Sequence, residues 1–447
     1  MGIAYDHKTE RATTASATTV VVQRAGLIAL TASGAAWVIV LARVLRHRIF
    51  ISHDTMISYA HVWYVSDRLW HGHGVPFAMP ILGHGKALAF PYGFVPWMTA
   101  ALLRPVLGDW VVTLWLVLGA VGVVAATLWA FPELRHPWLA TAVLLNPALI
   151  AGVLIGQLPF LWAAALLLAA IGCWRRNQRV GAIVLAALAQ VTHPAVILPI
   201  VGALVAGWMV FEPDRRALLR AYALSVLPAI PAALIVLHSP VFVETSAATK
   251  FVNFWSTVGP RVLIVAIPLA LVVAHDRLRT WAGPAVAATL IASTIAMGPG
   301  MGMPWAWRSL NRWPKDEFSG FLASRAFVPG ATYRLLLTLH GKLGEYQMLQ
   351  HGGRLDSEFF PESMGIQSWP NLPTYSGLLV QRHVDFVMAF RDYDHAWHTN
   401  EHALLDQLTH ARAAGCAKGL VATTRLAHNT HYDLYAVDRS CASRPVP

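Results

Sequence analysis

Residues 146–200 read NPALIAGVLIGQLPFLWAAALLLAAIGCWRRNQRVGAIVLAALAQVTHPAVILPI, and this stretch decides the fold of the chain. Apolar runs precede and follow the basic turn at Arg175 and Arg176, and another begins after His193 and Pro194. Apolar runs of about 17 to 25 residues are long enough to cross a bilayer as helices. The stretch therefore predicts consecutive membrane spans joined by short turns.

The composition of the whole chain agrees with this prediction. Of its 447 residues, 56% are hydrophobic and 13% are charged, whereas about a quarter of the residues in an ordinary soluble domain are charged. We predict a mainly α polytopic membrane protein with about nine spans, at 25–42, 110–131, 138–155, 158–173, 180–193, 195–211, 217–237, 260–274 and 281–298.

The stretch 89–107, AFPYGFVPWMTAALLRPVL, can be counted either as a further span or as a re-entrant or surface helix. Basic residues gather on the cytosolic side of membrane proteins. Counting 89–107 as a surface helix puts most arginines between spans on that side, and Pro91 and Pro96 also fit a broken helix. We therefore predict a cytoplasmic tail over 1–24, a membrane domain over 25–303 with a large outer loop over 43–109, and an extracytoplasmic domain over 304–447.

The C-terminal domain is expected to be α/β. Strands are predicted over 331–339, 383–390, 417–428 and 432–439, helices over 344–353 and 399–415, and a long loop over 354–379. Cys416 and Cys441 both lie in this domain, and either a disulfide bridge or two separate thiols fits the sequence.

The net charge of +11 does not indicate a nucleic-acid-binding protein. Many basic residues stand at the ends of apolar segments, where membrane topology explains them. The C-terminal domain has no basic stripe with interleaved aromatic residues, so no nucleic-acid partner is expected.

Polar side chains collect in residues 51–69, ISHDTMISYAHVWYVSDRL. Their spacing predicts an amphipathic helix that is capped by Ser52 or Asp54, continues to Trp70 and lies on the membrane surface. Asp54 is either a helix cap, which stabilises a helix by about 1 kcal/mol, or a catalytic carboxylate at the membrane boundary.

The order of these features resembles the GT-C superfamily of polyprenyl-phosphate-sugar-dependent glycosyltransferases, which have an acidic residue early in a large first outer loop. Residues 146–200 are similar to its bacterial mannosyltransferase branch through Gly156–Gln157, Arg175–Arg176 and His193–Pro194. The resemblance implies an enzyme in the cell membrane that transfers a mannose-like or arabinose-like sugar from a polyprenyl-phosphate donor. The acceptor would be an envelope glycan, lipid or protein on the outer face.

The resemblance also implies roles for single residues. Asp54 would be the general base of an inverting transfer, with His53 and Asp67 near the substrate. Gln157 and His193 would bind sugar hydroxyls, although packed polar residues between helices are common. Cations would face the leaving phosphate or, alternatively, contact lipid headgroups; the candidates are Arg68, Lys250 and Arg261.

A metal site is not predicted, although a divalent cation is possible. His71, His73 and His84 lie in a glycine-containing loop without the cysteine or carboxylate spacing of a metal site. Two other functions remain open, a non-catalytic scaffold or sensor of envelope assembly and a transporter or lipid flippase. Against a transporter, the predicted spans hold few ionisable residues and show no internal repeat.

Overall fold

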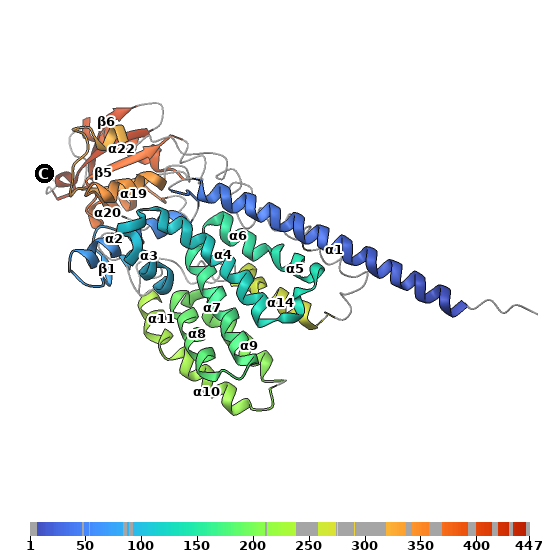
Figure 1. Ribbon diagram of the computed structural model, residues 1–447. Coiled ribbons are helices and arrows are strands. Elements are labelled where there is room, and N and C mark those ends of the chain that lie inside the picture. Colours follow the sequence, from blue (N-terminus) through green and yellow to red (C-terminus); the bar gives the residue numbers. More distant parts are fainter. Residues whose placement is uncertain are drawn as a thin grey trace, which may run out of the picture.

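A computed structural model describes residues 7–46, 49–52, 54–83, 87–88, 93–210, 212–237, 258–273, 275, 290, 319–336, 342–356, 369–391, 399–413, 419–428 and 432–443. Figure 1 shows a helical bundle with a small sheet domain at one end, and the long helix α1 (His7–Leu45) runs along the side of the bundle. The predicted span over 281–298 lies, apart from Leu290, outside the described residues.

Four stretches of helix in the described part of the chain are long and apolar enough to cross a membrane. They are Val20–Leu45 in α1, Trp110–Ala130 (α4), Pro137–Ile155 and Leu158–Arg175 (α7). The chain is therefore a helical membrane protein with several spans. The count of nine stays a prediction, because α8 (Arg179–Thr192), α9 (Pro194–Trp208) and α14 (Leu263–Val273) are shorter than these four.

Two of the predicted spans are interrupted. The span over 138–155 consists of α5 (Pro137–Leu144) and α6 (Pro147–Ile155), because the Asn146 side chain accepts a hydrogen bond from the backbone of Ala148 and starts a new helix at Pro147. The span over 217–237 consists of α10 (Arg215–Val226) and α11 (Ala229–Leu237).

Helix α2 (Thr55–Trp70) follows the range predicted for it, but its surroundings differ from the prediction. It packs against α3 (Phe94–Leu107) and against α19 (Lys342–Gln350) of the sheet domain, and most of its residues are buried. The position of α2 at the membrane surface stays a prediction, but its buried faces pack against protein elements rather than standing free. Helix α3 has 14 residues, which agrees with a short helix rather than a plain span over 89–107.

The sheet domain has five strands in the order β4 (Arg354–Leu355), β3 (Thr332–Leu336), β5 (Phe386–Phe390), β7 (Tyr432–Asp438) and β6 (Ala422–His428). Strand β3 is parallel to β4 and β5, and β7 is antiparallel to β5 and β6. Helices α20 (Leu372–Gln381) and α22 (Glu401–Ala413) complete the α/β arrangement. A two-residue hairpin outside this sheet, β1 (Ala78–Met79) with β2 (Ala87–Leu88), belongs to the loop after α2.

The loop predicted over 354–379 was wrong in part, because it contains β4 and most of α20. Asn371 caps α20 by accepting a hydrogen bond of 2.9 Å from the backbone of Thr374, and Pro373 stands in the first turn. Both are helix-start signals. Cys441 is disulfide-bonded and Cys173 is a free thiol, while Cys416 lies outside the described residues.

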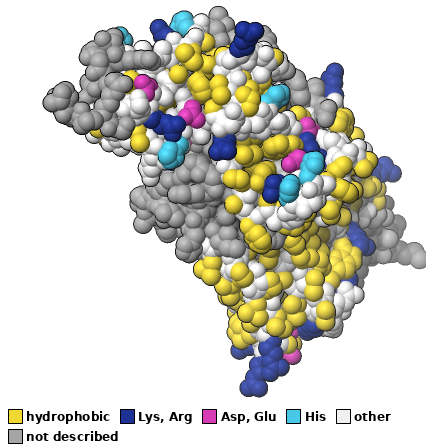
Figure 2. All heavy atoms as spheres, turned by 90° about the vertical axis from the view of Figure 1, so that its left-hand side faces the viewer, with side chains coloured by type: hydrophobic (Ala, Val, Ile, Leu, Met, Phe, Trp, Pro, Cys, Tyr) yellow, Lys and Arg dark blue, Asp and Glu magenta, His cyan; other side chains and the backbone are white. Residues whose placement is uncertain are grey.

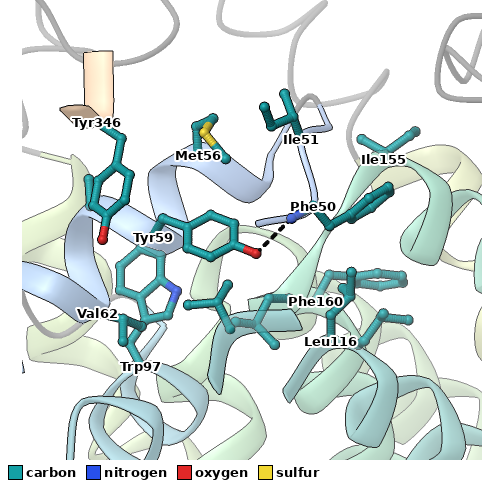
Figure 3. Close-up of a cluster of buried hydrophobic side chains, with 14 of the residues drawn as sticks. Phe50, Ile51, Met56, Tyr59, Val62, Trp97, Leu116, Ile155, Phe160 and Tyr346 are labelled. Carbon is teal, nitrogen blue, oxygen red and sulfur yellow. Dashed lines mark hydrogen bonds between the residues drawn. The ribbon is translucent and has the colours of Figure 1, made fainter. Parts of the chain in front are cut away.

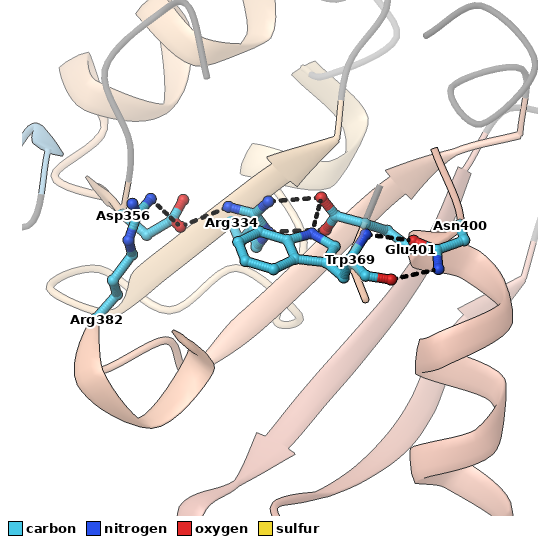
Figure 4. Close-up of polar contacts among 6 residues, drawn as sticks. All are labelled: Arg334, Asp356, Trp369, Arg382, Asn400 and Glu401. Atoms are coloured by element: carbon cyan, nitrogen blue, oxygen red, sulfur yellow. Dashed lines mark hydrogen bonds and ion pairs between the residues drawn. The ribbon is translucent and has the colours of Figure 1, made fainter. Parts of the chain in front are cut away.

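A buried network of charges joins three elements of the sheet domain (Figure 4). Arg334 on β3 donates two hydrogen bonds to Glu401 on α22, at 2.6 and 2.9 Å, and one of 2.9 Å to Asp356. The Trp369 indole also donates to Glu401, at 3.0 Å. These contacts hold α22 and the segment after β4 against β3.

Candidate functional site

The segment before α2 is held on the turn between α6 and α7. The backbone N–H of Asp54 donates to the carbonyl of Ile155 at 2.9 Å, and the Ser52 hydroxyl donates to the carbonyl of Leu154. Phe50 and Ile51 are buried beside Ile155 in the apolar cluster of Figure 3. The Asp54 loop and the Gly156–Gln157 turn, about 100 residues apart in sequence, therefore form one unit.

Asp54 stands at the start of α2 but does not act as its cap. Its side chain makes no capping hydrogen bond to the helix, and the residue is only partly buried. The Thr55 hydroxyl instead accepts a hydrogen bond of 2.8 Å from the backbone of Ser52. Because helix capping does not explain Asp54, the carboxylate remains a candidate for chemistry.

Gly156 allows the close approach of this turn to α2. Its φ is +81°, a region that side-chain-bearing residues rarely adopt, and an added Cβ would lie 2.2 Å from the Thr55 methyl carbon. The added Cβ would also lie 3.2 Å from the backbone nitrogen of Thr55, so the first turn of α2 would have to shift. A glycine is required here by both conformation and space.

We expect Gly156→Ala to move Asp54 and to lower any activity of this site by about tenfold to a hundredfold, since misplacement by about 1 Å can cost that much. The measurement is the rate of the variant in the transfer assay described below. The matched control is Gly74→Ala, which places alanine at a φ of +75° in open space. Equal losses in the two variants would contradict the proposed contact between Gly156 and α2.

Gln157 occupies the first position before α7, next to Gly156. It is buried, and its side-chain amide has no hydrogen-bond partner within the described part of the chain. Its free donors and acceptor therefore suit a polar ligand at this turn.

His193 and Arg261 both contact the Phe160 ring. The imidazole meets Phe160 edge-on with ring centres 6.3 Å apart, and the Arg261 guanidinium carbon is 5.7 Å from the centre of the same ring. His193 also experiences the charges of Asp54 and Arg261. The structure thus brings together four of the predicted residues, Asp54, Gln157, His193 and Arg261.

The other predicted site residues are not in this group. Asp67 and Arg68 lie at the far end of α2, about 20 Å along the helix from Asp54 at 1.5 Å per residue. Asp67 pairs there with His71 at 3.2 Å, and both side chains are exposed. Any contact of Asp67 or Arg68 with a substrate would involve a part of it far from Asp54. His53 and Lys250 lie outside the described residues.

Residues that could hold a metal ion are not gathered anywhere in the part of the chain that the structure describes. His71 and His73 follow α2, and the predicted loop residue His84 is outside the described residues. The Asp67–His71 pair supplies two groups only.

A second buried carboxylate, which sequence reasoning missed, ties the sheet domain to the bundle. Asp109, just before α4, accepts hydrogen bonds from the Tyr346 hydroxyl at 2.7 Å and from Arg104 at 3.0 Å. Tyr346 is on α19, and its ring lies 5.8 Å from that of Tyr59 on α2 (Figure 3). Burial, and then the charge of Asp109, raise the pKa of Tyr346, so its hydroxyl stays protonated and donates.

We expect Tyr346→Phe to weaken the docking of the sheet domain by about 1–3 kcal/mol, because a buried group loses its partner. Hydrogen exchange of α2 and α19 should accelerate. Tyr64→Phe is the matched control, since Tyr64 is a buried tyrosine of α2, the helix against which α19 packs. Unchanged exchange in Tyr346→Phe would show that this contact does not hold the two parts together.

An apolar groove begins beside this group and runs along α8. Gly93, before α3, donates a backbone hydrogen bond of 3.0 Å to Thr192, the residue before His193. The groove starts at the neighbours of these two residues and has a volume of about 580 Å³. It is lined by Phe94, Val191, Leu188, Val184, Leu224 and Pro228, among others. The polar group around Phe160 therefore adjoins a surface suited to a hydrocarbon chain.

No protein-family model and no curated protein matches the chain. Among solved structures it is similar to the crystal structure of ArnT from Cupriavidus metallidurans bound to undecaprenyl phosphate, with 12% identity, a TM-score of 0.45, and 93% of this chain and 99% of that chain covered. It is also similar to the crystal structure of the Archaeoglobus fulgidus oligosaccharyltransferase in the apo form, with 12% identity, a TM-score of 0.46, and 83% and 71% covered. At TM-scores below 0.5 they transfer no residue role, substrate or activity to this chain.

Proposed function

We propose that the chain is an integral membrane glycosyltransferase that moves a sugar from a polyprenyl-phosphate donor to a hydroxyl-bearing acceptor on the extracytoplasmic face. The observation that carries the proposal is the grouping of Asp54, Gln157, His193 and Arg261 around one helix turn and the Phe160 ring. These residues come from four separate regions of the sequence, and no single structural role explains them together.

The height of this group in the membrane supports the proposal. Helix α7 separates Gln157 from Arg175 by about 27 Å, close to the roughly 30 Å of a bilayer's hydrocarbon core. Basic residues mark the cytosolic side, so the Arg175 end is the cytosolic one in this proposal. Asp54 then stands at the opposite headgroup level, where the anomeric carbon of a lipid-linked sugar would lie.

The chemistry requires a base and a cation. Asp54 takes the proton from the acceptor hydroxyl as its oxygen attacks the anomeric carbon, on the face opposite the phosphate. The bond between that carbon and the phosphate oxygen breaks, and the lipid phosphate leaves with the electron pair. Because the reaction is a single displacement, the configuration of the anomeric centre is inverted.

Arg261 is assigned to the leaving lipid phosphate, because a guanidinium matches the geometry of phosphate oxygens and stabilises the charge that develops there. Gln157 and His193 are assigned to sugar hydroxyls. The groove along α8 is assigned to the polyprenyl chain, since it leads away from His193 and its lining is apolar. A mannose-like or arabinose-like sugar and an envelope glycan, lipid or protein acceptor remain the proposed substrates.

The test is a transfer assay with the purified protein in liposomes. A panel of radiolabelled polyprenyl-phosphate sugars is supplied with a membrane extract as the source of acceptor. Label that leaves the lipid fraction and appears in an acceptor only when the protein is present supports a transferase. Label that crosses the bilayer while still attached to the lipid supports a flippase, and label that does neither supports a scaffold; each of these two results contradicts the proposal.

A further inference from the structure

A second apolar cavity lies at the end of the bundle away from Asp54 and is lined by residues of α7, α8, α9 and α10. Its volume is about 90 Å³, and its lining includes Leu167, Ala186, Leu204, Trp208 and Leu218. The groove along α8 described above shares Ile183 with this cavity, and its other lining residues are different.

The side chains that line this cavity are mostly apolar. Tyr222 and Ser225 are its hydroxyl-bearing residues. The Ser225 hydroxyl already donates to the carbonyl of Tyr222 at 2.9 Å and accepts from the Gln190 amide at 3.0 Å. An occupant would therefore be an apolar chain rather than a polar solute.

A cation with an unsatisfied donor stands beside the cavity. The Arg179 guanidinium carbon lies 3.6 Å from the centre of the Trp174 ring, and Trp174 lines the cavity. The Nη1 atom of Arg179 is buried and has no hydrogen-bond partner among the residues described. A buried charged donor without an acceptor is unfavourable, so this atom is suited to an anion that arrives from outside.

The surroundings of Arg179 carry an excess of positive charge. Helix α10, whose Leu218 lines the cavity, bears three exposed arginines in its first two turns, Arg215, Arg216 and Arg220. The two nearby carboxylates have other partners, since Glu212 accepts from the Trp174 indole at 3.0 Å and Asp214 caps α10 at 3.0 Å. Figure 2 shows basic side chains at the lower tip of the molecule, beneath an apolar surface.

We propose that this cavity binds the part of one acyl chain nearest the headgroup of an anionic phospholipid, with the phosphate held by Arg179 and the arginines of α10. An apolar chain joined to a single anionic headgroup matches the lining and the charge at once, and anionic lipids attract basic segments at the membrane surface. A charge-assisted hydrogen bond between guanidinium and phosphate would orient the lipid, with its headgroup at Arg179. This site lies outside the proposed transferase site and does not depend on that activity.

The experiment measures lipid retention. The protein is reconstituted in nanodiscs that contain equal amounts of phosphatidylglycerol and phosphatidylcholine, released into mild detergent, and analysed by native mass spectrometry. We expect one retained phospholipid, with phosphatidylglycerol favoured by about tenfold. Ala186→Phe, which fills the cavity, and Arg179→Gln, which removes the cation, should each lower retention of phosphatidylglycerol by about tenfold.

Val180→Phe is the matched control, because Val180 is on the same helix, is 75% exposed and is not one of the cavity's lining residues. It should leave retention unchanged. Equal retention of the two lipids, or undiminished phosphatidylglycerol in either of the first two variants, overturns the proposal. Should Ala186→Phe fail to fold, as judged by its melting curve, Arg179→Gln decides alone.

Discussion

Asp54→Asn is expected to lower the rate of sugar transfer by about 10²–10⁴-fold, the contribution of a positioned general base. Asparagine keeps the size of the side chain but cannot take the proton of the acceptor hydroxyl. The backbone bond from residue 54 to Ile155 does not depend on the side chain, so the loop should stay in place. The loss should therefore appear in kcat, with the KM for the lipid donor little changed.

Asp67→Asn is the matched control, since it removes a carboxylate from the other end of the same helix. We expect its kcat to equal that of the wild-type protein, and a role in binding a distant part of the substrate would appear in KM alone. Full transfer by Asp54→Asn would remove Asp54 from the mechanism. A comparable loss of kcat in Asp67→Asn would show that the effect comes from charge in the loop rather than from a base.

Arg334→Met is expected to destabilise the sheet domain by about 3–5 kcal/mol, because it breaks a buried ion network by removing its central cation. Asp356 and Glu401 are both nearly inaccessible to solvent and would lose that cation (Figure 4). Burial alone lowers the pKa of Arg334, but the charges of Glu401 and Asp356 outweigh it and hold the pKa above its ordinary value. Arg334 is therefore charged at any physiological pH.

The measurement is hydrogen exchange of β3 and β5, which should accelerate by a factor that corresponds to this loss of stability. Arg391→Met is the matched control, because Arg391 directly follows β5 and is exposed; it should change stability by less than about 0.5 kcal/mol. Equal acceleration in the two variants would show that the buried network contributes no more than a surface arginine.

The membrane part was predictable where a local pattern, such as a continuous apolar run, determines the secondary structure. Continuous apolar runs predicted α4 and α7 nearly to the residue, and the pattern of strands and helices in the C-terminal domain predicted β3, β5, β6, β7, α19 and α22. The break at Asn146 was missed because hydropathy was read without its helix-start signal, which is Asn followed by Pro. Helix α20 was missed for the same reason at Asn371.

The candidate site was predictable only in part. The order of Asp54, Gly156–Gln157 and His193 suggested a common location, and the structure brings them together. Periodicity could not show that Tyr346 reaches Asp109 across more than 200 residues, because a contact of that kind depends on how two domains dock. The same docking buries part of α2, so the amphipathic pattern that suggested a membrane surface also serves an interface between protein elements.

Sided labelling of single cysteines tests the central claim most directly, because the mechanism requires Asp54 on the extracytoplasmic side. In a Cys173→Ser background, His71→Cys places an exposed thiol at the end of α2, and Gln178→Cys places one in the turn between α7 and α8. Intact cells are treated with a membrane-impermeant maleimide. We predict that the thiol at position 71 is modified and that the one at 178 reacts only in inverted vesicles; the reverse pattern would contradict the account.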